Sequence, residues 1–261
     1  MELTKVLYEK QGKVGVIKLN RPEVLNAIDD DTLEELAAVF TEMDKDDDIR
    51  CVVLASTSPK AFSAGGDIAE EYKKGCLEGF HFIKGFTRVS TLMEQFKAPV
   101  IAAINGYCLG GGVEIALACD IRIAADNAKF GSPEVSLGLL PGAGGTQRLP
   151  RTIGMSQAKL WMFTGDKYSA QRSLELGLVD IVTPAEKLMD EAMALAEKLA
   201  SRAPLSIRYI KTLVNEGMQT DMQRAQQMEA SMASHLFTTQ DKAEACRAFL
   251  EKRPCGEFTG K

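Results

Sequence analysis

The segment from Val100 to Cys119 constrains the fold of this chain more than any other. It reads VIAAINGYCLGGGVEIALAC, which is nearly all apolar and about long enough to cross a lipid bilayer. Yet it contains Asn105, Glu114 and four glycines, and Asp120 follows it directly. Because charged and helix-breaking residues at these places are costly in lipid, we predict a strand, a turn and a helix buried in a protein core.

The sequence on both sides of this segment alternates between strand and helix patterns. Runs rich in valine and isoleucine predict strands, and apolar residues at helical spacing predict helices. Asp31 is the expected N-cap of the first helix, because its side chain can accept a hydrogen bond from the first turn. The expected strands span residues 14–19, 51–55, 99–104 and 121–125, and the expected helices begin at Thr32 and span residues 77–96 and 111–118. Such alternation is typical of an α/β domain.

Beyond Val182 the pattern changes to helices alone. Glycine becomes scarce, and helices are expected at residues 185–201, 205–217, 221–235 and 239–252. We therefore divide the chain into an α/β core, residues 1–195, and a helical C-terminal region, residues 196–261. Amphipathic helices appended in this way cover either their own subunit or a neighbour in an oligomer.

Charge and composition argue against several classes of function. A formal net charge of -5 and an isoelectric point near 5.3 disfavour a nucleic-acid-binding protein, which needs a clustered basic face. Residues 1–20 contain no uninterrupted apolar run of the kind a signal peptide has. Six cysteines without a CxxC pair are typical of a reduced, cytoplasmic protein. With two histidines, His81 and His235, and no GxSxG motif, we expect neither a metal site nor a hydrolase triad.

Glu114 is the most informative candidate for catalysis. The helix expected around it contains only glycine, alanine, valine, isoleucine and leucine besides, so it has no polar face for a carboxylate. A buried carboxylate must be paired, hydrogen-bonded or protonated. A salt bridge to Arg122 or Arg148 is one possibility. We favour an acid/base role, because apolar burial raises a carboxyl pKa in the way that such catalysts require.

Glu134 and two glycine runs are weaker candidates when each is taken alone. Glu134 follows Pro133 in a glycine-rich stretch and is as easily a capping or solvated residue. The runs AGGD at residues 64–67 and LGGG at residues 109–112 place bare N–H groups where a strand meets a helix. Each run could be a simple tight turn, whereas the two together could form an oxyanion hole. Without a Walker lysine, neither run fits a phosphate loop.

Six groups of motifs, in order, resemble the enoyl-CoA hydratase (crotonase) family, and the resemblance covers essentially the whole chain. They are LNRP at residues 19–22 with LNA at 25–27, AFSAGGDI at 61–68, INGYCLGGGVE at 104–114 with CDIR at 119–122, FGSPE at 130–134, LPGAGGTQRL at 140–149 and AFLEKR at 248–253. The resemblance implies an α/β fold, a crotonase-type repeated ββα superhelix core. It also implies a helical C-terminal region that supports trimerisation and covers CoA.

The same resemblance implies a reaction and the groups that perform it. The reaction is the reversible syn addition of water to a trans-2-enoyl-CoA, giving a 3-hydroxyacyl-CoA, with a short acyl chain. Glu114 would deprotonate the attacking water and Glu134 would protonate the α-carbon. The backbone N–H groups of Gly66 and Gly111 would bind the thioester oxygen, and that of Gly142 would help to fix the water. No cofactor is expected beyond the CoA of the substrate.

Other positions match contacts that the family makes with CoA. They lie in two N-terminal loops and the C-terminal helix: Arg21, Val24, Ala64, Asp67, Ile68, Phe249 and Lys252. Three positions depart from the commonest pattern: Ser132 where glutamine is usual, Ala69 where lysine is common, and Glu23 where a basic residue is common. Ser132 concerns the hydrogen bonds of the loop before Glu134, and Ala69 and Glu23 concern the contacts with the CoA phosphates. A homo-oligomer, a trimer or a dimer of trimers, is implied, without nucleic-acid or membrane partners.

Other reactions remain open within this resemblance. A Δ3-Δ2 enoyl-CoA isomerase can work with the carboxylate at the Glu134 position alone, so the presence of Glu114 as well favours water addition. A carnitinyl-CoA dehydratase is a further alternative. A non-catalytic acyl-CoA-binding scaffold or an RNA-binding member is disfavoured by the intact carboxylates and the acidic charge. The acyl pocket is expected to be shaped by residues 70–87, with Tyr72, Phe80, Phe82, Ile83 and Phe86.

Overall fold

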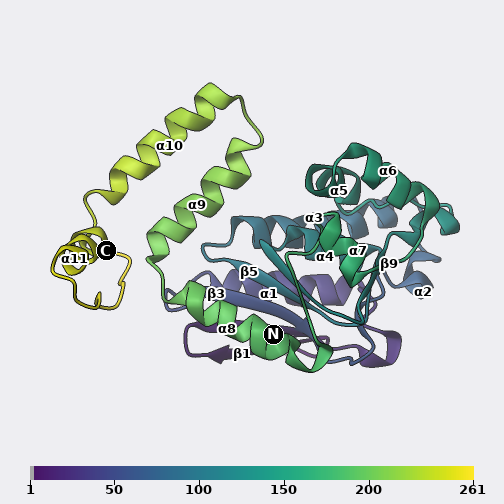
Figure 1. Cartoon of the computed structure of the whole chain (residues 1–261). Helices are drawn as coiled ribbons and strands as arrows, with labels where there is room; N and C mark the ends of the chain where they lie inside the picture. Colours follow the sequence, from purple (N-terminus) through teal and green to yellow (C-terminus); the bar gives the residue numbers. More distant parts are fainter. Residues whose placement is uncertain (1–2) are drawn as a thin grey trace.

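The computed structural model describes residues 3–261 and contains two β-sheets surrounded by helices (Figure 1). The larger sheet has six strands in the order β1-β2-β3-β5-β7-β10, and the smaller has four in the order β4-β6-β8-β9. The pairs β1–β2 and β8–β9 are antiparallel, and the other neighbours are parallel. The strands are β1 (Val6–Gln11), β2 (Val14–Leu19), β3 (Cys51–Ser56), β4 (Ala61–Ser63), β5 (Val100–Ile104), β6 (Tyr107–Leu109), β7 (Ile121–Ala125), β8 (Lys129–Gly131), β9 (Tyr168–Ser169) and β10 (Ile181–Thr183).

From β3 to β8, successive strands alternate between the two sheets, and each pair is followed by a helix. β3 and β4 precede α2 and α3, β5 and β6 precede α4, and β7 and β8 precede η2 and α5. This is the repeated ββα arrangement, so the predicted α/β fold is confirmed. The helices of this part are η1 (Pro22–Val24), α1 (Asp30–Met43), α2 (Ile68–Glu71), α3 (Cys76–Gln95), α4 (Gly111–Ala118), η2 (Pro133–Leu137), α5 (Gly145–Ile153), α6 (Met155–Thr164) and α7 (Ala170–Glu175).

The apolar segment at residues 100–119 forms the centre of this arrangement. It supplies β5 to the larger sheet, β6 to the smaller sheet and then α4, all eight residues of which are buried. The strand, turn and helix predicted for this segment are therefore confirmed. Among residues 3–261, none of the helices combines the length and the apolar character that a membrane crossing needs.

The central strands β2, β3 and β5 of the larger sheet are covered on both faces, which explains why they are almost wholly apolar. Along β3, Val52 and Leu54 belong to the core shared with α1 and α3, while Cys51 and Val53 face the other way. The second face packs against α8 (Leu188–Ala200), which lies across the sheet in Figure 1 and contributes alanines such as Ala192. Close helix–sheet packing of this kind needs small side chains on the helix.

The first long helix begins two residues before the predicted position. Asp29, not Asp31, is the N-cap of α1, and its side chain accepts a hydrogen bond of 2.8 Å from the Thr32 N–H. Asp29 is buried and also forms ion pairs with Lys5 and Arg21. Those long-range partners hold Asp29 in the capping position, and they cannot be foreseen from the local pattern that favoured Asp31.

The C-terminal helices extend from the core. After η3 (Ala185–Lys187) and α8, helices α9 (Pro204–Gly217) and α10 (Met222–Leu236) form a hairpin that projects from the body, and α11 (Gln240–Leu250) follows it (Figure 1). Lys211 of α9 is buried and ties the hairpin to the core, since its Nζ donates to Met93 O at 2.8 Å and to Ala98 O at 3.1 Å. The domain boundary at residues 195/196 stays a prediction.

Candidate active site

Two glycine turns meet at one edge of the smaller sheet. β4 and β6 are parallel neighbours, so the turns that follow them lie side by side. Gly65 has a φ of 101° and Gly110 a φ of 52°, a left-handed region that favours glycine. A β-carbon on Gly111 would lie 3.5 Å from the Gly66 nitrogen, so the two turns are in close contact.

The N–H groups of Gly66 and Gly111 are the free donors of these turns. Ile28 holds the first turn on either side of Gly66, because it donates to Gly65 O at 2.8 Å and accepts from the Asp67 N–H at 2.9 Å. Gly111 is the first residue of α4, where backbone N–H groups have no partner within the helix. Neither N–H donates a hydrogen bond to any acceptor among residues 3–261. Two adjacent free donors, one at a helix N-terminus, can bind an oxyanion.

Glu114 lies on α4, one turn after these donors, with only 3% of its surface exposed. Neither arginine considered as its partner forms an ion pair with it. Arg122 pairs with Asp180 at 3.3 Å, and Arg148 pairs with Glu94 at 2.7 Å. The salt-bridge alternative is therefore wrong, and the carboxylate is held in another way.

That other contact is a backbone hydrogen bond. The N–H of Gly145, at the start of α5, donates to Glu114 Oε1 at 2.6 Å. The pKa of Glu114 is raised to about 7, because burial and the nearby Glu134 raise it more than the hydrogen bond from Gly145 lowers it. A carboxyl with a pKa near neutrality is suited to exchange protons with water.

Glu134 lies on η2, and both of its carboxylate oxygens are buried without a hydrogen-bond partner among residues 3–261. It faces the second glycine turn, since a β-carbon on Gly110 would lie 3.3 Å from Glu134 Oε1. Burial raises the pKa of Glu134, and the negative charge of Glu71 adds to the effect. An unpaired buried carboxyl is costly when ionised, so this position favours a protonated group that can donate.

Ser132, one of the departures from the family pattern, fixes the loop that carries Glu134. Its buried Oγ accepts a hydrogen bond of 3.1 Å from the indole N–H of Trp161 on α6. The Trp161 ring stacks on Tyr168 with a centroid distance of 4.0 Å. The serine therefore anchors the start of η2 against a rigid aromatic pair.

These groups line one cavity of about 720 Å³. Both glycine turns, Glu114, Glu134 and Gly142 border it, so the structure brings together the residues that the sequence analysis assigned to the reaction. Most of the remaining wall is apolar, including four of the five side chains expected to shape an acyl pocket: Tyr72, Phe82, Ile83 and Phe86. Phe80, the fifth, is not part of the wall.

The sequence analysis missed two residues of this site. Gly145 was treated as part of a motif, and its bond to Glu114 depends on how α5 folds back on α4. Glu71 brings a third carboxylate to the cavity. It lies in the segment 70–87 expected to shape the acyl pocket, but the four charged residues among positions 70–74 give that stretch the appearance of a solvated helix end, so Glu71 itself was not singled out.

The residues matched to CoA contacts fall into two groups. Ala64 and Ile68 line the cavity, and Arg21 lies beside them, paired with Asp67 at 3.0 Å. Val24 is exposed on η1, close to Arg21 in the chain. The remaining two are elsewhere: Phe249 and Lys252 lie at the end of α11, on the opposite side of the molecule from α2 (Figure 1). Within one chain the structure does not bring these two to the cavity.

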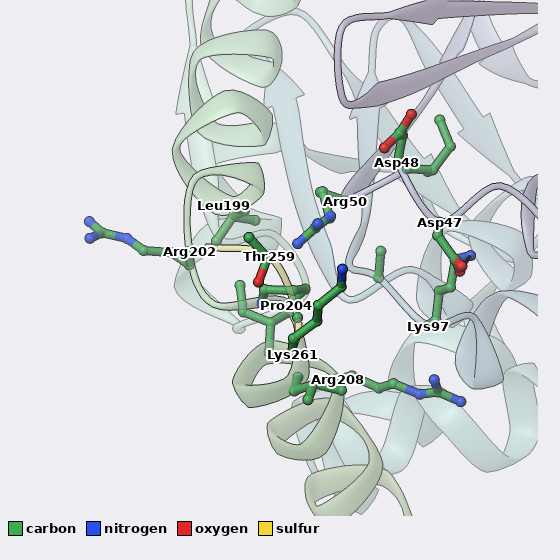
Figure 2. A pocket seen from close by; sticks show the side chains of 15 residues that line it. Asp47, Asp48, Arg50, Lys97, Leu199, Arg202, Pro204, Arg208, Thr259 and Lys261 are labelled. Atoms are coloured by element: carbon green, nitrogen blue, oxygen red, sulfur yellow. Dashed lines mark hydrogen bonds and ion pairs between the residues drawn. The ribbon is translucent and has the colours of Figure 1, made fainter. Parts of the chain in front are cut away.

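A second cavity, of about 380 Å³, lies between the loop at residues 47–50 and the junction of α8 and α9 (Figure 2). Its wall is charged, and the side chains of Arg50 and Lys261 both point toward its middle, while Arg202 points away (Figure 2). It contains none of the glycine turns and neither glutamate. The two glutamates and the two glycine turns are thus gathered in the first cavity.

Parallel ββα repeats that bring two glycine turns and two buried glutamates to one apolar cavity define the crotonase class of proteins. A model of the enoyl-CoA hydratase/isomerase family matches residues 9–261. The chain therefore belongs to the enoyl-CoA hydratase/isomerase family.

Individual relatives agree along the whole chain. The short-chain-enoyl-CoA hydratase of Clostridium acetobutylicum is 43% identical over 261 residues, 100% of each chain. The crotonyl-CoA hydratase of Syntrophomonas wolfei is 42% identical over 253 residues, 97% of each chain. The crystal structure of an enoyl-CoA hydratase from Bacillus anthracis superposes with a TM-score of 0.95 at 39% identity, covering 99% of this chain and 100% of that one.

Proposed function

We propose that this protein is an enoyl-CoA hydratase, a hydro-lyase that reversibly adds water to trans-2-enoyl-CoA with a short acyl chain. The observation that carries the proposal is the placement of Glu114 and Glu134 in one apolar cavity beside the free N–H groups of Gly66 and Gly111. Full-length similarity to hydratases named for short-chain enoyl-CoA and crotonyl-CoA supports the substrate.

The chemistry follows from these positions. The thioester oxygen accepts hydrogen bonds from the Gly66 and Gly111 N–H groups, which makes the β-carbon electrophilic and stabilises the enolate that forms. Glu114 takes one proton from a water molecule as its oxygen bonds to the β-carbon. Glu134 then gives a proton to the α-carbon, and the carbonyl is restored. The N–H of Gly142, which borders the cavity, is proposed to help hold the water. Dehydration runs the same steps backwards.

We further propose that the active form is a homo-oligomer, a trimer or a dimer of trimers. The hairpin of α9 and α10 exposes large apolar side chains, among them Ile210, Val214 and Met222, which is typical of a surface that packs against another subunit. Phe249 and Lys252 would then reach the CoA of a neighbour, since neither lines the cavity of its own chain. The predictions of a cytoplasmic location and of no cofactor besides CoA accompany this proposal.

Labelled water separates hydration from isomerisation. With crotonyl-CoA in H2(18)O, a hydratase gives a 3-hydroxybutyryl-CoA whose new hydroxyl carries the label, which mass spectrometry detects. An isomerase instead converts 3-butenoyl-CoA to crotonyl-CoA without taking up oxygen. Isomerisation without any labelled product would contradict the proposal and favour the isomerase alternative.

A further inference from the structure

Glu71 places a carboxylate where no step of the proposed reaction needs one. It is the last residue of α2, and its side chain lies over the first oxyanion turn, since a β-carbon on Gly66 would collide with Glu71 Oε1. It borders the same cavity as Glu114 and Glu134. The wall is mainly apolar and includes Phe82 and Ile83 on α3, with Lys74 as the one cationic side chain among the described residues that borders it.

The positive charges near Glu71 are committed to other partners. Lys74, one turn further along the chain, forms an ion pair with Asp30 and lies over the Phe82 ring at 5.0 Å. Arg21 is paired with Asp67. Among residues 3–261, no group forms a hydrogen bond or an ion pair with the Glu71 carboxylate. Burial and the charge of Asp67 raise the pKa of Glu71 more than the charge of Lys74 lowers it.

The Glu71 carboxylate would be stabilised by any hydrogen-bond donor or cation that a ligand brings. The wall is partly buried and mainly apolar, so charges there interact more strongly than they do in water. A second negative charge in the same space is repelled by the Glu71 carboxylate, and rejecting the wrong partner by like charge is an effective source of specificity. The glutamate side chain has three rotatable bonds, so it can turn from Gly66 toward an acyl chain without any movement of α2.

Building on the proposed hydratase function, we infer that Glu71 makes the acyl site discriminate by charge. The site accepts short enoyl chains that carry a hydrogen-bond donor or a positive charge near carbon 4, and it rejects chains that carry a second carboxylate there. Glu71 is thus a specificity-determining residue, distinct from the two glutamates that move protons.

The test compares CoA thioesters that differ only in their substituent at carbon 4. The panel is trans-2-butenoyl-CoA and its derivatives with a hydroxyl, a trimethylammonium or a carboxylate group at that carbon. The kcat/KM of each is measured for the wild type and for Glu71→Gln. Glu70→Gln is the matched control, because it removes the same charge from the same helix at a residue outside the cavity wall.

We expect the ratio of kcat/KM for the cationic over the anionic thioester to fall at least about tenfold in Glu71→Gln. Glu70→Gln should keep the wild-type ratio. Inhibition constants of the saturated analogues, butanoyl-CoA and its 4-substituted forms, and a Glu71→Met variant give the same comparison without turnover. A ratio unchanged in both Glu71 variants would overturn the inference. Failure of the wild type to hydrate any member of the panel would instead overturn the proposed function.

Discussion

Glu114 Oε1 accepts a hydrogen bond of 2.6 Å from the backbone N–H of Gly145. A β-carbon on Gly145 would lie only 2.9 Å from the same oxygen, so the backbone approaches this carboxylate closely. The bond orients the carboxyl without neutralising it, because the donor is an uncharged N–H at the start of α5. Burial opposes ionisation and this hydrogen bond favours it, and the balance holds the pKa of Glu114 at about 7.

This raised pKa makes the stability of the fold depend on pH. The folded protein binds the Glu114 proton more tightly than the unfolded chain does, with a pKa of about 7 against 4.5. The stabilisation is therefore complete below pH 4.5 and is lost as the pH rises to about 7, a change of about 3 kcal/mol. Glu114→Gln lacks this loss, so the variant should gain free energy of unfolding over the wild type between pH 5 and pH 8. Urea denaturation at both values measures the gain, and a difference that does not vary with pH would be incompatible with this account.

The same group should shape the pH dependence of hydration. Glu114 accepts a proton in this direction, so kcat/KM with crotonyl-CoA should rise with pH as the carboxyl ionises, with a midpoint near 7. Glu134 donates a proton in this direction, and burial raises its pKa above the ordinary value, which favours the protonated form. Initial rates from pH 5 to pH 9 test the rise across pH 7. A rate that is flat across pH 7 would show that Glu114 does not control the step.

Gly111→Ala should damage the oxyanion hole. The new β-carbon would lie 2.9 Å from the buried Phe86 ring, so the ring or the start of α4 that carries the Gly111 N–H must shift. Loss of one donor costs a factor of about 10²–10³ in rate, which steady-state kinetics with crotonyl-CoA would detect. Gly217→Ala is the matched control, because its β-carbon would make only an ordinary 3.6 Å contact with Ala225. Equal rates for both variants would remove the Gly111 turn from the reaction.

Ser132→Ala should destabilise the protein and lower its activity together. It leaves the Trp161 N–H buried without its acceptor, at a cost of about 1–3 kcal/mol. The same change loosens the start of η2, two residues before Glu134. Ser173→Ala is a direct comparison, because Ser173 is also fully buried but its hydroxyl has no hydrogen-bond partner among the described residues. Thermal unfolding and crotonyl-CoA turnover should change for Ser132→Ala only.

Local sequence patterns were sufficient to predict many of the strands and helices. The strand Val14–Leu19 and the helix Gly111–Ala118 have the predicted bounds, because each carries its own periodicity or glycine start. The short strands of the smaller sheet, such as Ala61–Ser63 and Tyr107–Leu109, could not be predicted in this way. A segment of three residues is too short to show a periodic pattern. Such a strand forms only because it pairs with strands far away in the chain.

Some residues of the active site could likewise be identified from the sequence, and others could not. Glu114 could be identified because a carboxylate in an apolar helix is conspicuous in the sequence alone. Its bond to Gly145 links residues 31 positions apart, and the contact of Glu71 with Gly66 depends on how α2 turns back. Such contacts belong to the folded chain, so only the structure shows that the cavity holds a third carboxylate.

The loss of crotonyl-CoA absorbance on addition of the protein tests the central claim most directly, with Glu114→Gln and Glu134→Gln measured alongside. The account predicts turnover by the wild type, and a decrease on the order of 10²–10⁴ for each variant. Binding of the saturated butanoyl-CoA should be largely retained, since neither change alters the shape of the cavity. Wild-type turnover that persists unchanged in Glu114→Gln would contradict the proposed mechanism.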